Sequence, residues 1–272
     1  MQTCQNCGDT RQEKFCPNCG EKTFHAKALS IKHLAGETFE SLSHFDNKFF
    51  KSVATLLIRP GVLSYQYCNG VTVRFMKPFS LFLVANLIFF LLPVQNPFSL
   101  PLYNYVTYEP FTTMGNTREA VRAKLRETGL TEKELTSTFN ERIRSNSKIF
   151  IALFIPFFAG IFALIFFSSR KRFGEHLVFA THFMTFLICL MVLLTLFFML
   201  TPISFNAGSG DTVVTIILSL ILCTYLSIGV HRFYVRSWWK AVLASLVIVV
   251  SLIISEQAFR MFLFYQVLSG IG

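Results

Sequence analysis

The feature that most constrains this chain is its series of long apolar runs. The longest extends from Leu177 to Leu200 and contains no Asp, Glu, Lys or Arg. About 20 consecutive apolar residues suffice for a helix to cross the hydrocarbon core of a bilayer. Of the 272 residues, 53% are hydrophobic and only 15% are charged, against about 25% charged in ordinary globular domains. A soluble domain of this size cannot bury so much apolar surface, so we predict an all-α integral membrane bundle.

Five apolar runs, taken with their flanking residues, predict five transmembrane helices. They lie at residues 78–95, 148–168, 176–200, 212–230 and 238–256. The first is the shortest, because Pro78 and Pro93 bracket it. Its apolar stretch covers about 21 Å of a hydrocarbon core about 30 Å thick, so it crosses only if flanking residues join it. Pro156 predicts a kink in the second run.

The basic residues of the short loops predict the orientation. The loop that follows the second run contains Arg170, Lys171 and Arg172, and the loop that follows the fourth is also basic, whereas residues 201–212 contain no Lys or Arg. The positive-inside rule then places the N-terminus in the cytoplasm and a tail of residues 257–272 outside. The alternative is that the first run does not cross, which would invert every later loop and place two basic loops outside.

Residues 96–147 form the long connection between the first two runs and are expected outside as a helical loop. We predict two polar helices, at 117–128 and 131–144, separated at Gly129. Thr131 and Glu134 have the spacing of a capping box, in which the threonine caps the second helix.

A cluster of cysteines near the N-terminus is the strongest chemical signal. Cys4, Cys7, Cys16 and Cys19 form two Cys-x2-Cys pairs, and each pair is followed by a glycine. Two such pairs can enclose one tetrahedral ion, and thiolate ligands favour zinc, although iron also accepts them. Four protein ligands leave no open position for chemistry. We therefore predict a zinc ribbon at residues 1–24, with one structural Zn²⁺ per chain that supplies the folding energy of a module too small for a core.

The charges bear on the partners of this ribbon. Lys and Arg number 25 and Asp and Glu 15, giving a net charge of +10. The excess is spread over the loops, which is typical of flanks beside an anionic membrane surface. In the ribbon itself, basic and acidic residues balance, so nucleic acid is not an expected partner. We expect the lipid bilayer, and a cytoplasmic protein docked through the ribbon; the oligomeric state stays open.

Residues 25–77 join the ribbon to the first run and are predicted as amphipathic juxtamembrane helices. Apolar residues recur every three or four positions between 28 and 57. Arg59, Pro60 and Gly61 then end the helix, because proline disfavours a helical residue before it. A second short piece, 62–77, ends near Arg74, where aromatic and basic residues together suit the headgroup region. These four residues form a candidate juxtamembrane motif.

Polar residues at the start of the third run form a second candidate site. Glu175, His176 and His182 lie within two turns of one predicted helix. Ionisable groups inside a membrane are costly and are functional candidates, as a proton relay, a ligand pair or a headgroup contact. The alternative is structural: Glu175 and His176 start the helix at the interface, and His182 makes a hydrogen bond between helices. No third and fourth metal ligand accompanies the histidines, and no catalytic constellation stands elsewhere, so we do not expect an enzyme.

Several motifs together resemble a bacterial family of unknown function that combines a short zinc ribbon with a multi-span membrane domain. They include Cys4 to Gly8, Phe15 to Gly20, Leu56 to Gly61, Arg74 to Pro78 and Glu175 to Phe183. The ribbon in that family usually ends Cys-Gly-Gln, whereas this chain has Glu21. The resemblance implies a fold and a compartment, the bacterial inner membrane, and no reaction.

From these features we expect a membrane scaffold or sensor whose ribbon docks a cytoplasmic partner. The alternative is a transporter or a lipid-handling protein with a polar intramembrane site at Glu175, His176 and His182.

Overall fold

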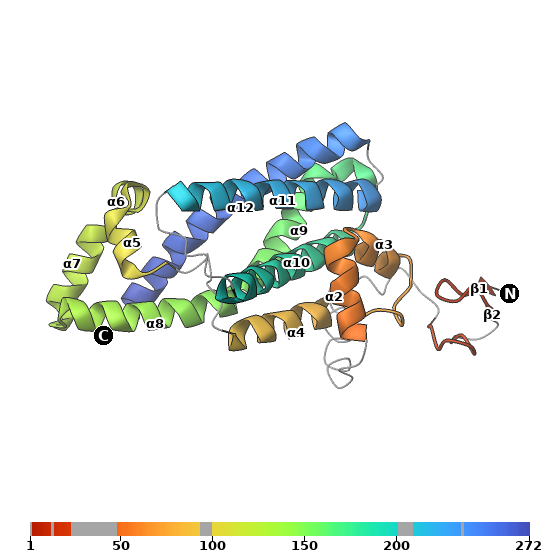
Figure 1. Cartoon of the computed structure of the whole chain (residues 1–272), viewed down its shortest axis with the longest axis horizontal. Coiled ribbons are helices and arrows are strands. Elements are labelled where there is room, and N and C mark those ends of the chain that lie inside the picture. Colours follow the sequence, from red (N-terminus) through yellow and green to blue (C-terminus); the bar gives the residue numbers. More distant parts are fainter. Residues whose placement is uncertain (1, 12–13, 23–47, 93–99, 201–208, 235–236) are drawn as a thin grey trace. The chain divides into compact units, whose positions relative to one another are not determined.

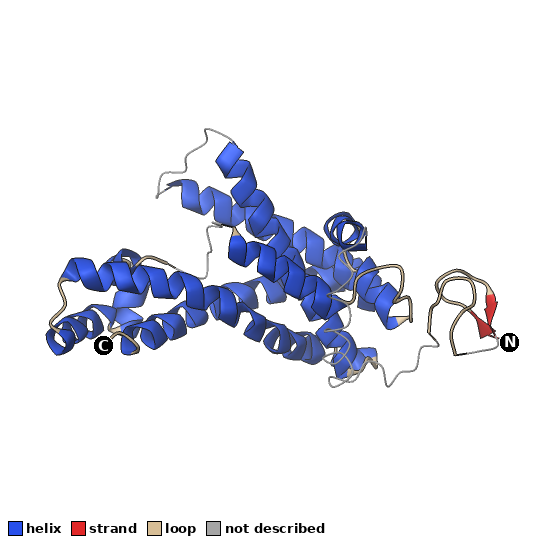
Figure 2. Ribbon diagram, turned by 90° about the horizontal axis from the view of Figure 1, so that it is seen from below, coloured by secondary structure: helices blue, strands red, loops and turns tan. Residues whose placement is uncertain are grey.

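The structure is a computed structural model, and it describes residues 2–11, 14–22, 48–92, 100–200, 209–234 and 237–272. Apart from two short strands near the N-terminus, its regular elements are helices (Figure 2). The contacts divide the chain into two units. The first comprises Met1–Pro93 and Phe154–Val249, and the second comprises Val94–Leu153 and Val250–Gly272.

Three of the described helices are long and apolar enough to cross a membrane, which indicates a membrane protein. They are α10 (Phe173–Leu200), α11 (Ser209–Tyr234) and α12 (Trp238–Ser269). The first two predicted spans correspond to the shorter apolar helices α4 (Pro78–Leu91) and α9 (Phe154–Ile165). At 1.5 Å per residue these two extend about 21 Å and about 18 Å. Helix length and composition therefore support three of the five predicted crossings.

The apolar helix within the second predicted span, 148–168, begins at Phe154. Helix α8 (Glu132–Phe150) runs into this span, and a 3-10 turn, η2 (Ile151–Leu153), separates α8 from α9. Pro156 explains the break, because it has no N–H to donate and its ring clashes with the carbonyl four residues earlier. The kink predicted from this proline is thus a full interruption of the helix.

Helix α10 is the central helix of the first unit (Figure 1). It contacts α9, α4, α2 (Lys48–Ile58) and α3 (Val62–Cys68). Its apolar window is 67% buried, against 33% for α11 and α12. Aromatic rings fill much of this packing: Phe179 meets Phe162 at 4.9 Å and Phe233 at 5.0 Å between ring centroids. Most of the surface of α10 is packed against its neighbours. The polar side chains that this helix carries are therefore held in fixed positions.

The juxtamembrane prediction holds in part. Helix α2 buries Phe49, Ser52 and Leu56, the three-and-four spacing expected of an amphipathic helix. Helix α3 ends at Cys68, so the predicted piece at 62–77 is helical only in its first half. The chain then turns through Gly70, whose φ of 87° is favourable only for glycine. Residues 25–47 of the predicted region lie outside the described residues.

The second unit is built from α5 (Leu102–Thr107), α6 (Glu109–Gly115), α7 (Thr117–Thr128), α8 and the C-terminal part of α12. Its core contains Tyr105, Phe139 and Phe264, with ring centroids 5.0–5.9 Å apart. The predicted helix at 117–128 is confirmed, with Gly129 in the left-handed region at its end. The capping box is confirmed as well: the Thr131 N–H donates to Glu134 at 2.9 Å, and the Glu134 N–H to the Thr131 hydroxyl at 3.3 Å.

Residues 257–272, predicted as an external tail after the fifth span, form the end of a helix. They continue α12 as helix to Ser269. The i,i+4 ion pair of Glu256 and Arg260, 2.7 Å long, supports the helix across the boundary. Packing also stabilises this part of the helix, because Phe264 and Leu263 are fully buried in the second unit.

Candidate metal centre and interhelical polar contacts

The N-terminal module consists of two copies of the same turn. In each, the glycine after the second cysteine has a positive φ, 79° at Gly8 and 72° at Gly20, and donates to the carbonyl of the first cysteine at 2.9 Å. The first cysteine N–H donates to the residue after that glycine, Cys4 to Asp9 at 2.8 Å and Cys16 to Glu21 at 2.9 Å. Strands β1 (Gln2–Thr3) and β2 (Thr10–Arg11) pair antiparallel beside the first turn. The backbone therefore presents two equivalent cysteine pairs.

These turns bring the four sulfurs together. All four lie within 4.8 Å of one another, and the Cys4–Cys19 and Cys7–Cys16 sulfurs are 3.6 Å apart. A tetrahedral ion with metal–sulfur bonds of about 2.3 Å places its ligands about 3.8 Å apart. The four cysteines are therefore close enough to hold one metal ion.

Two thiols of the cluster have pKa values shifted in opposite directions: a backbone hydrogen bond with Asp9 favours the Cys7 thiolate, but desolvation and the neighbouring thiols outweigh it and raise the pKa of Cys7 to about 12. Hydrogen bonds from the Asn6 side chain, the larger cause, and from the Glu21 backbone lower the pKa of Cys19 to about 7. Metal ligation requires the thiolate. Cys68 lies outside the group of four, and burial raises the pKa of its thiol well above the usual range. The cluster, not the cysteine content as such, is the feature that fits a metal.

Glu21 anchors this module to the rest of the first unit, and sequence reasoning missed that role. Its carboxylate accepts hydrogen bonds from the N–H groups of Thr72 and Val73, both 2.9 Å long, and from the Thr72 hydroxyl at 2.5 Å. The Glu21 side chain is only 1% exposed. No spacing in the sequence links positions 51 residues apart, so only the change from the usual glutamine pointed to this residue.

The Arg59-Pro60-Gly61 turn is held by side chains of α11. Pro60 has no N–H, so the carbonyl of Leu56 loses its intrahelical donor. The Tyr225 hydroxyl donates to this carbonyl at 3.0 Å instead, and Arg232 donates to the Pro60 carbonyl at 3.2 Å.

Gly61 lies against the backbone of α11. A Cβ at Gly61 would lie 2.7 Å from the Gly229 carbonyl oxygen, and the φ of Gly61 is 79°. Both the close approach and the left-handed backbone require glycine. The motif therefore fixes the joint between α2 and α3 against α11.

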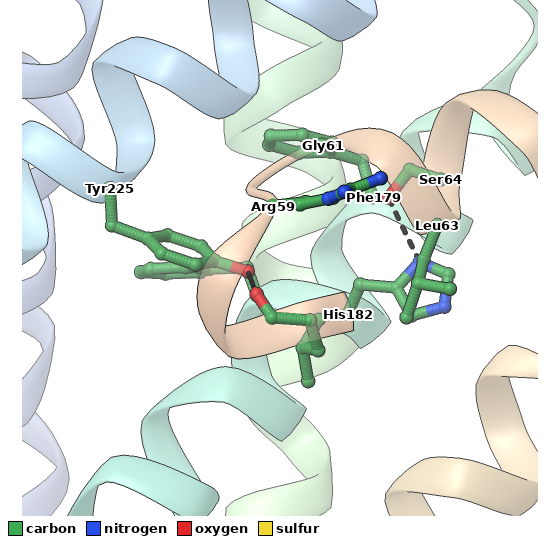
Figure 3. Close-up of a pocket in the computed structure, with 9 residues that line it drawn as sticks. Arg59, Gly61, Leu63, Ser64, Phe179, His182 and Tyr225 are labelled. Carbon is green, nitrogen blue, oxygen red and sulfur yellow. Dashed lines mark hydrogen bonds between the residues drawn. The ribbon is translucent and has the colours of Figure 1, made fainter. Parts of the chain in front are cut away.

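His182 makes a buried hydrogen bond to α3. Its Nδ1 lies 2.9 Å from the Ser64 hydroxyl, with the His182 side chain 4% exposed and Ser64 1% exposed (Figure 3). The two residues line a small cavity with Arg59 and Tyr225, and the space holds about one water molecule. A serine beside a histidine resembles a nucleophile–base pair, yet a substrate has no room here. The geometry is that of an interhelical contact.

Glu175 and His176 have other partners. The Glu175 carboxylate accepts from Lys171 at 2.9 Å and from the Arg172 N–H at 2.9 Å, an arrangement that caps the start of α10. His176 Nδ1 lies 2.8 Å from the Tyr234 hydroxyl of α11. The structure thus gives Glu175, His176 and His182 three separate sets of partners. Among the described residues, no group of three or more potential metal ligands includes them.

Arg74, the fourth residue of the candidate juxtamembrane motif, and Asn86 of α4 are the next two polar residues. Arg74 is exposed, and its guanidinium lies 5.6 Å from the centre of the Phe75 ring. The Asn86 amide oxygen is buried and accepts no hydrogen bond from any group in the described part of the chain.

The fold and the cysteine centre define a class: a helical membrane protein with a four-cysteine cluster that can hold a metal. Residues 46–90 match the model of a family described as a protein of unknown function (DUF3667). That segment contains α2, the Arg59–Gly61 turn, α3 and nearly all of α4. No curated protein and no solved structure matches the chain.

Proposed function

We propose that the protein is a scaffold or sensor of the bacterial inner membrane whose zinc ribbon docks a cytoplasmic partner. The observation that carries this proposal is the buried contact of Glu21 with Thr72 and Val73. It joins a module that a metal ion would organise to the segment that leads directly into α4. Either loss of the ion or binding of a partner to the ribbon would then change the contact between Glu21 and the segment that precedes α4.

The coupling follows from the backbone of the second cysteine turn. Glu21 is oriented by Gly20 and by the hydrogen bond of its carbonyl to the Cys16 N–H. A ribbon of about 20 residues has no core that keeps this turn without an ion. Zinc is the proposed ion, because four thiolates in a closed tetrahedral set suit a structural zinc site. The ion would stabilise the fold of the ribbon and would take no part in chemistry in the membrane domain.

Contacts in the second unit support a crossing by α9. The Asn146 side chain donates to Gln266 at 2.9 Å, so the end of α8 and the end of α12 belong to the same side of the membrane. An even number of crossings must separate them. Helices α9, α10, α11 and α12 provide that number, whereas α10, α11 and α12 alone do not.

Contacts in the first unit support a crossing by α4. Arg232 donates to the Pro60 carbonyl, which assigns the Arg59–Gly61 turn to the side on which α11 ends. Three crossings then separate Arg232 from Asn146, so an odd number must separate Asn146 from Pro60. Helix α4 is the apolar helix between them in the described part of the chain. This count supports the proposed five crossings, and the basic loops after the second and fourth spans support a cytoplasmic ribbon and an external C-terminus.

The test is a pull-down of the full-length protein from bacterial membranes, in parallel with its metal content by elemental mass spectrometry. The variants are Cys16→Ser and, as the matched control, Cys68→Ser, which removes a cysteine outside the cluster. We expect one zinc per chain in the wild type and the control, and the loss of both zinc and partner in Cys16→Ser. A partner that is retained after complete loss of metal would contradict a docking role for the ribbon.

The alternative of transport or lipid handling through Glu175, His176 and His182 has less support. The three side chains have separate partners, and the cavity beside His182 holds about one water molecule. His182→Ala should therefore leave partner capture and metal content unchanged.

A further inference from the structure

The segment after Gly70 presents a set of anion-binding donors. The N–H groups of Thr72 and Val73 and the Thr72 hydroxyl converge on one carboxylate, that of Glu21. Successive backbone N–H groups that point at one oxyanion form an anion-binding concavity of the kind that also accepts phosphate. The donors belong to the membrane domain, whereas the anion belongs to the ribbon.

Two cations lie near Phe75, which follows these donors in the chain. The Arg74 guanidinium and the Lys51 ammonium lie 5.6 and 5.7 Å from the centre of the same ring, that of Phe75. Both side chains are exposed. Neither forms an ion pair with a carboxylate of the described residues. A hydrogen bond joins the segment of Phe75 to α2, the helix of Lys51: the Met76 N–H donates to the buried Ser52 hydroxyl at 2.9 Å.

The surroundings of these cations are those of a membrane surface. Phe50, the neighbour of Lys51, is 68% exposed, and Ile58 at the end of the same helix is 76% exposed. Pro78, four residues after Arg74, begins the apolar helix α4. Exposed apolar side chains beside cations at the start of an apolar helix are typical of headgroup depth.

We infer that Thr72, Val73, Arg74 and Lys51 form a binding site for the phosphate of an anionic phospholipid headgroup, and that Glu21 occupies the site as an internal competitor. Carboxylate and phosphate oxygens accept the same N–H and O–H donors, so the ribbon and the lipid cannot both use them. A phosphodiester gains in addition from Lys51 and Arg74, which Glu21 leaves without a carboxylate partner. Ribbon docking and lipid binding would therefore exclude each other at this loop.

The inference uses the Glu21 contact on which the proposed function rests, but it requires no cytoplasmic partner. A failed pull-down and a failed lipid test are thus separate results. The metal content of each variant, measured in parallel, shows whether the ribbon is intact.

The experiment is native mass spectrometry of the detergent-purified full-length protein with phosphatidylglycerol, phosphatidylcholine or inorganic phosphate. Glu21→Gln removes the competing charge, and we expect phosphatidylglycerol binding to strengthen about tenfold. Adding Lys51→Gln and Arg74→Gln to the Glu21→Gln variant should weaken its phosphatidylglycerol binding by at least about tenfold. Phosphatidylcholine should bind weakly to every variant.

Two matched controls accompany these variants. Asp9→Asn removes one charge at the equivalent position of the first cysteine turn, and Lys240→Gln removes an exposed cation that lies 5.2 Å from the Trp239 ring. Both should bind phosphatidylglycerol like the wild type. The inference is overturned if Asp9→Asn strengthens binding as much as Glu21→Gln, or if the Lys51 and Arg74 changes have no effect. Displacement of the lipid by an equal concentration of inorganic phosphate would overturn the assignment to a lipid headgroup.

Discussion

Two threonine–glutamate contacts in this protein use the same atoms for different purposes. At the start of α8, the N–H and hydroxyl of Thr131 donate to Glu134 three residues later, at an exposed site. In the first unit, the N–H and hydroxyl of Thr72 donate to Glu21, a side chain 1% exposed and 51 residues away. The first contact caps the start of a helix, and water can replace it. The second joins two modules, and when the carboxylate leaves, its partly buried donors lose their acceptor at a cost in free energy unless another acceptor takes its place.

The difference teaches where polar contacts carry function in this fold. A local contact depends only on the backbone around it, so it persists whatever the rest of the chain does. The Glu21 contact depends on the geometry of the cysteine turn and of the Gly70 loop together. It is therefore sensitive to events in either module.

Metal removal should have the largest effect, and it should affect the Glu21–Thr72 contact but not the Thr131–Glu134 contact. Structural zinc contributes about 10–16 kcal/mol to the folding of isolated zinc-finger modules, so a chelator should unfold the ribbon and release Glu21. We expect hydrogen exchange to accelerate at Thr72 and Val73 and to stay unchanged at Thr131. The measurement is hydrogen–deuterium exchange by mass spectrometry, with metal loss verified on the same sample. Unchanged protection at Thr72 after complete metal loss would show that the ribbon docks without its ion.

Glu21→Ala should have the next largest effect, and it should leave the metal in place. Loss of a buried charged acceptor costs about 1.5–3 kcal/mol, which corresponds to exchange at Thr72 and Val73 faster by about 10- to 100-fold. Asp9→Ala, at the equivalent position of the first turn, is the control and should change neither amide. A double-mutant cycle with Thr72→Val isolates the pair, since residues in contact show coupling and distant ones do not.

A third contact extends the comparison to the helices. Ser64 and His182 are 118 residues apart and form a buried hydrogen bond of 2.9 Å. Ser64→Ala and His182→Ala should each cost about 1–3 kcal/mol, seen as earlier thermal unfolding in detergent, and their coupling in a double-mutant cycle should be about 1 kcal/mol. Neither should alter zinc content or exchange at Thr72. Loss of metal in His182→Ala would instead connect α10 to the ribbon and contradict the separation of these sites.

The same contrast explains what the sequence could and could not predict. The Thr131–Glu134 capping box and the two Cys-x2-Cys turns are local, so their spacing predicts their geometry. Pro156 likewise predicted a kink, because its effect falls on its own helix, and the structure has a full interruption there. Glu21, Ser64 and Tyr225 meet partners between 51 and 169 residues away. Their pairing is decided by how the helices pack, and no spacing encodes it. Helix α12 continues beyond the end of the predicted fifth span, and the burial of Phe264, which depends on tertiary packing, stabilises its last turns.

Thr131→Ala should have the smallest effect, and its pH dependence identifies the cause. Loss of a threonine N-cap costs about 1 kcal/mol. The hydrogen bonds from the Thr131 side chain, the larger cause, and from its backbone lower the pKa of Glu134 below 4.5. The charged carboxylate is favoured in the folded state, so the capping box stabilises the protein above pH 4.5 and loses this contribution as the pH falls through the lowered pKa. In thermal unfolding, the gap between wild type and Thr131→Ala should narrow on acidification through this range. Glu134→Gln, which cannot titrate, should show no such narrowing when it is compared with the double variant Thr131→Ala/Glu134→Gln.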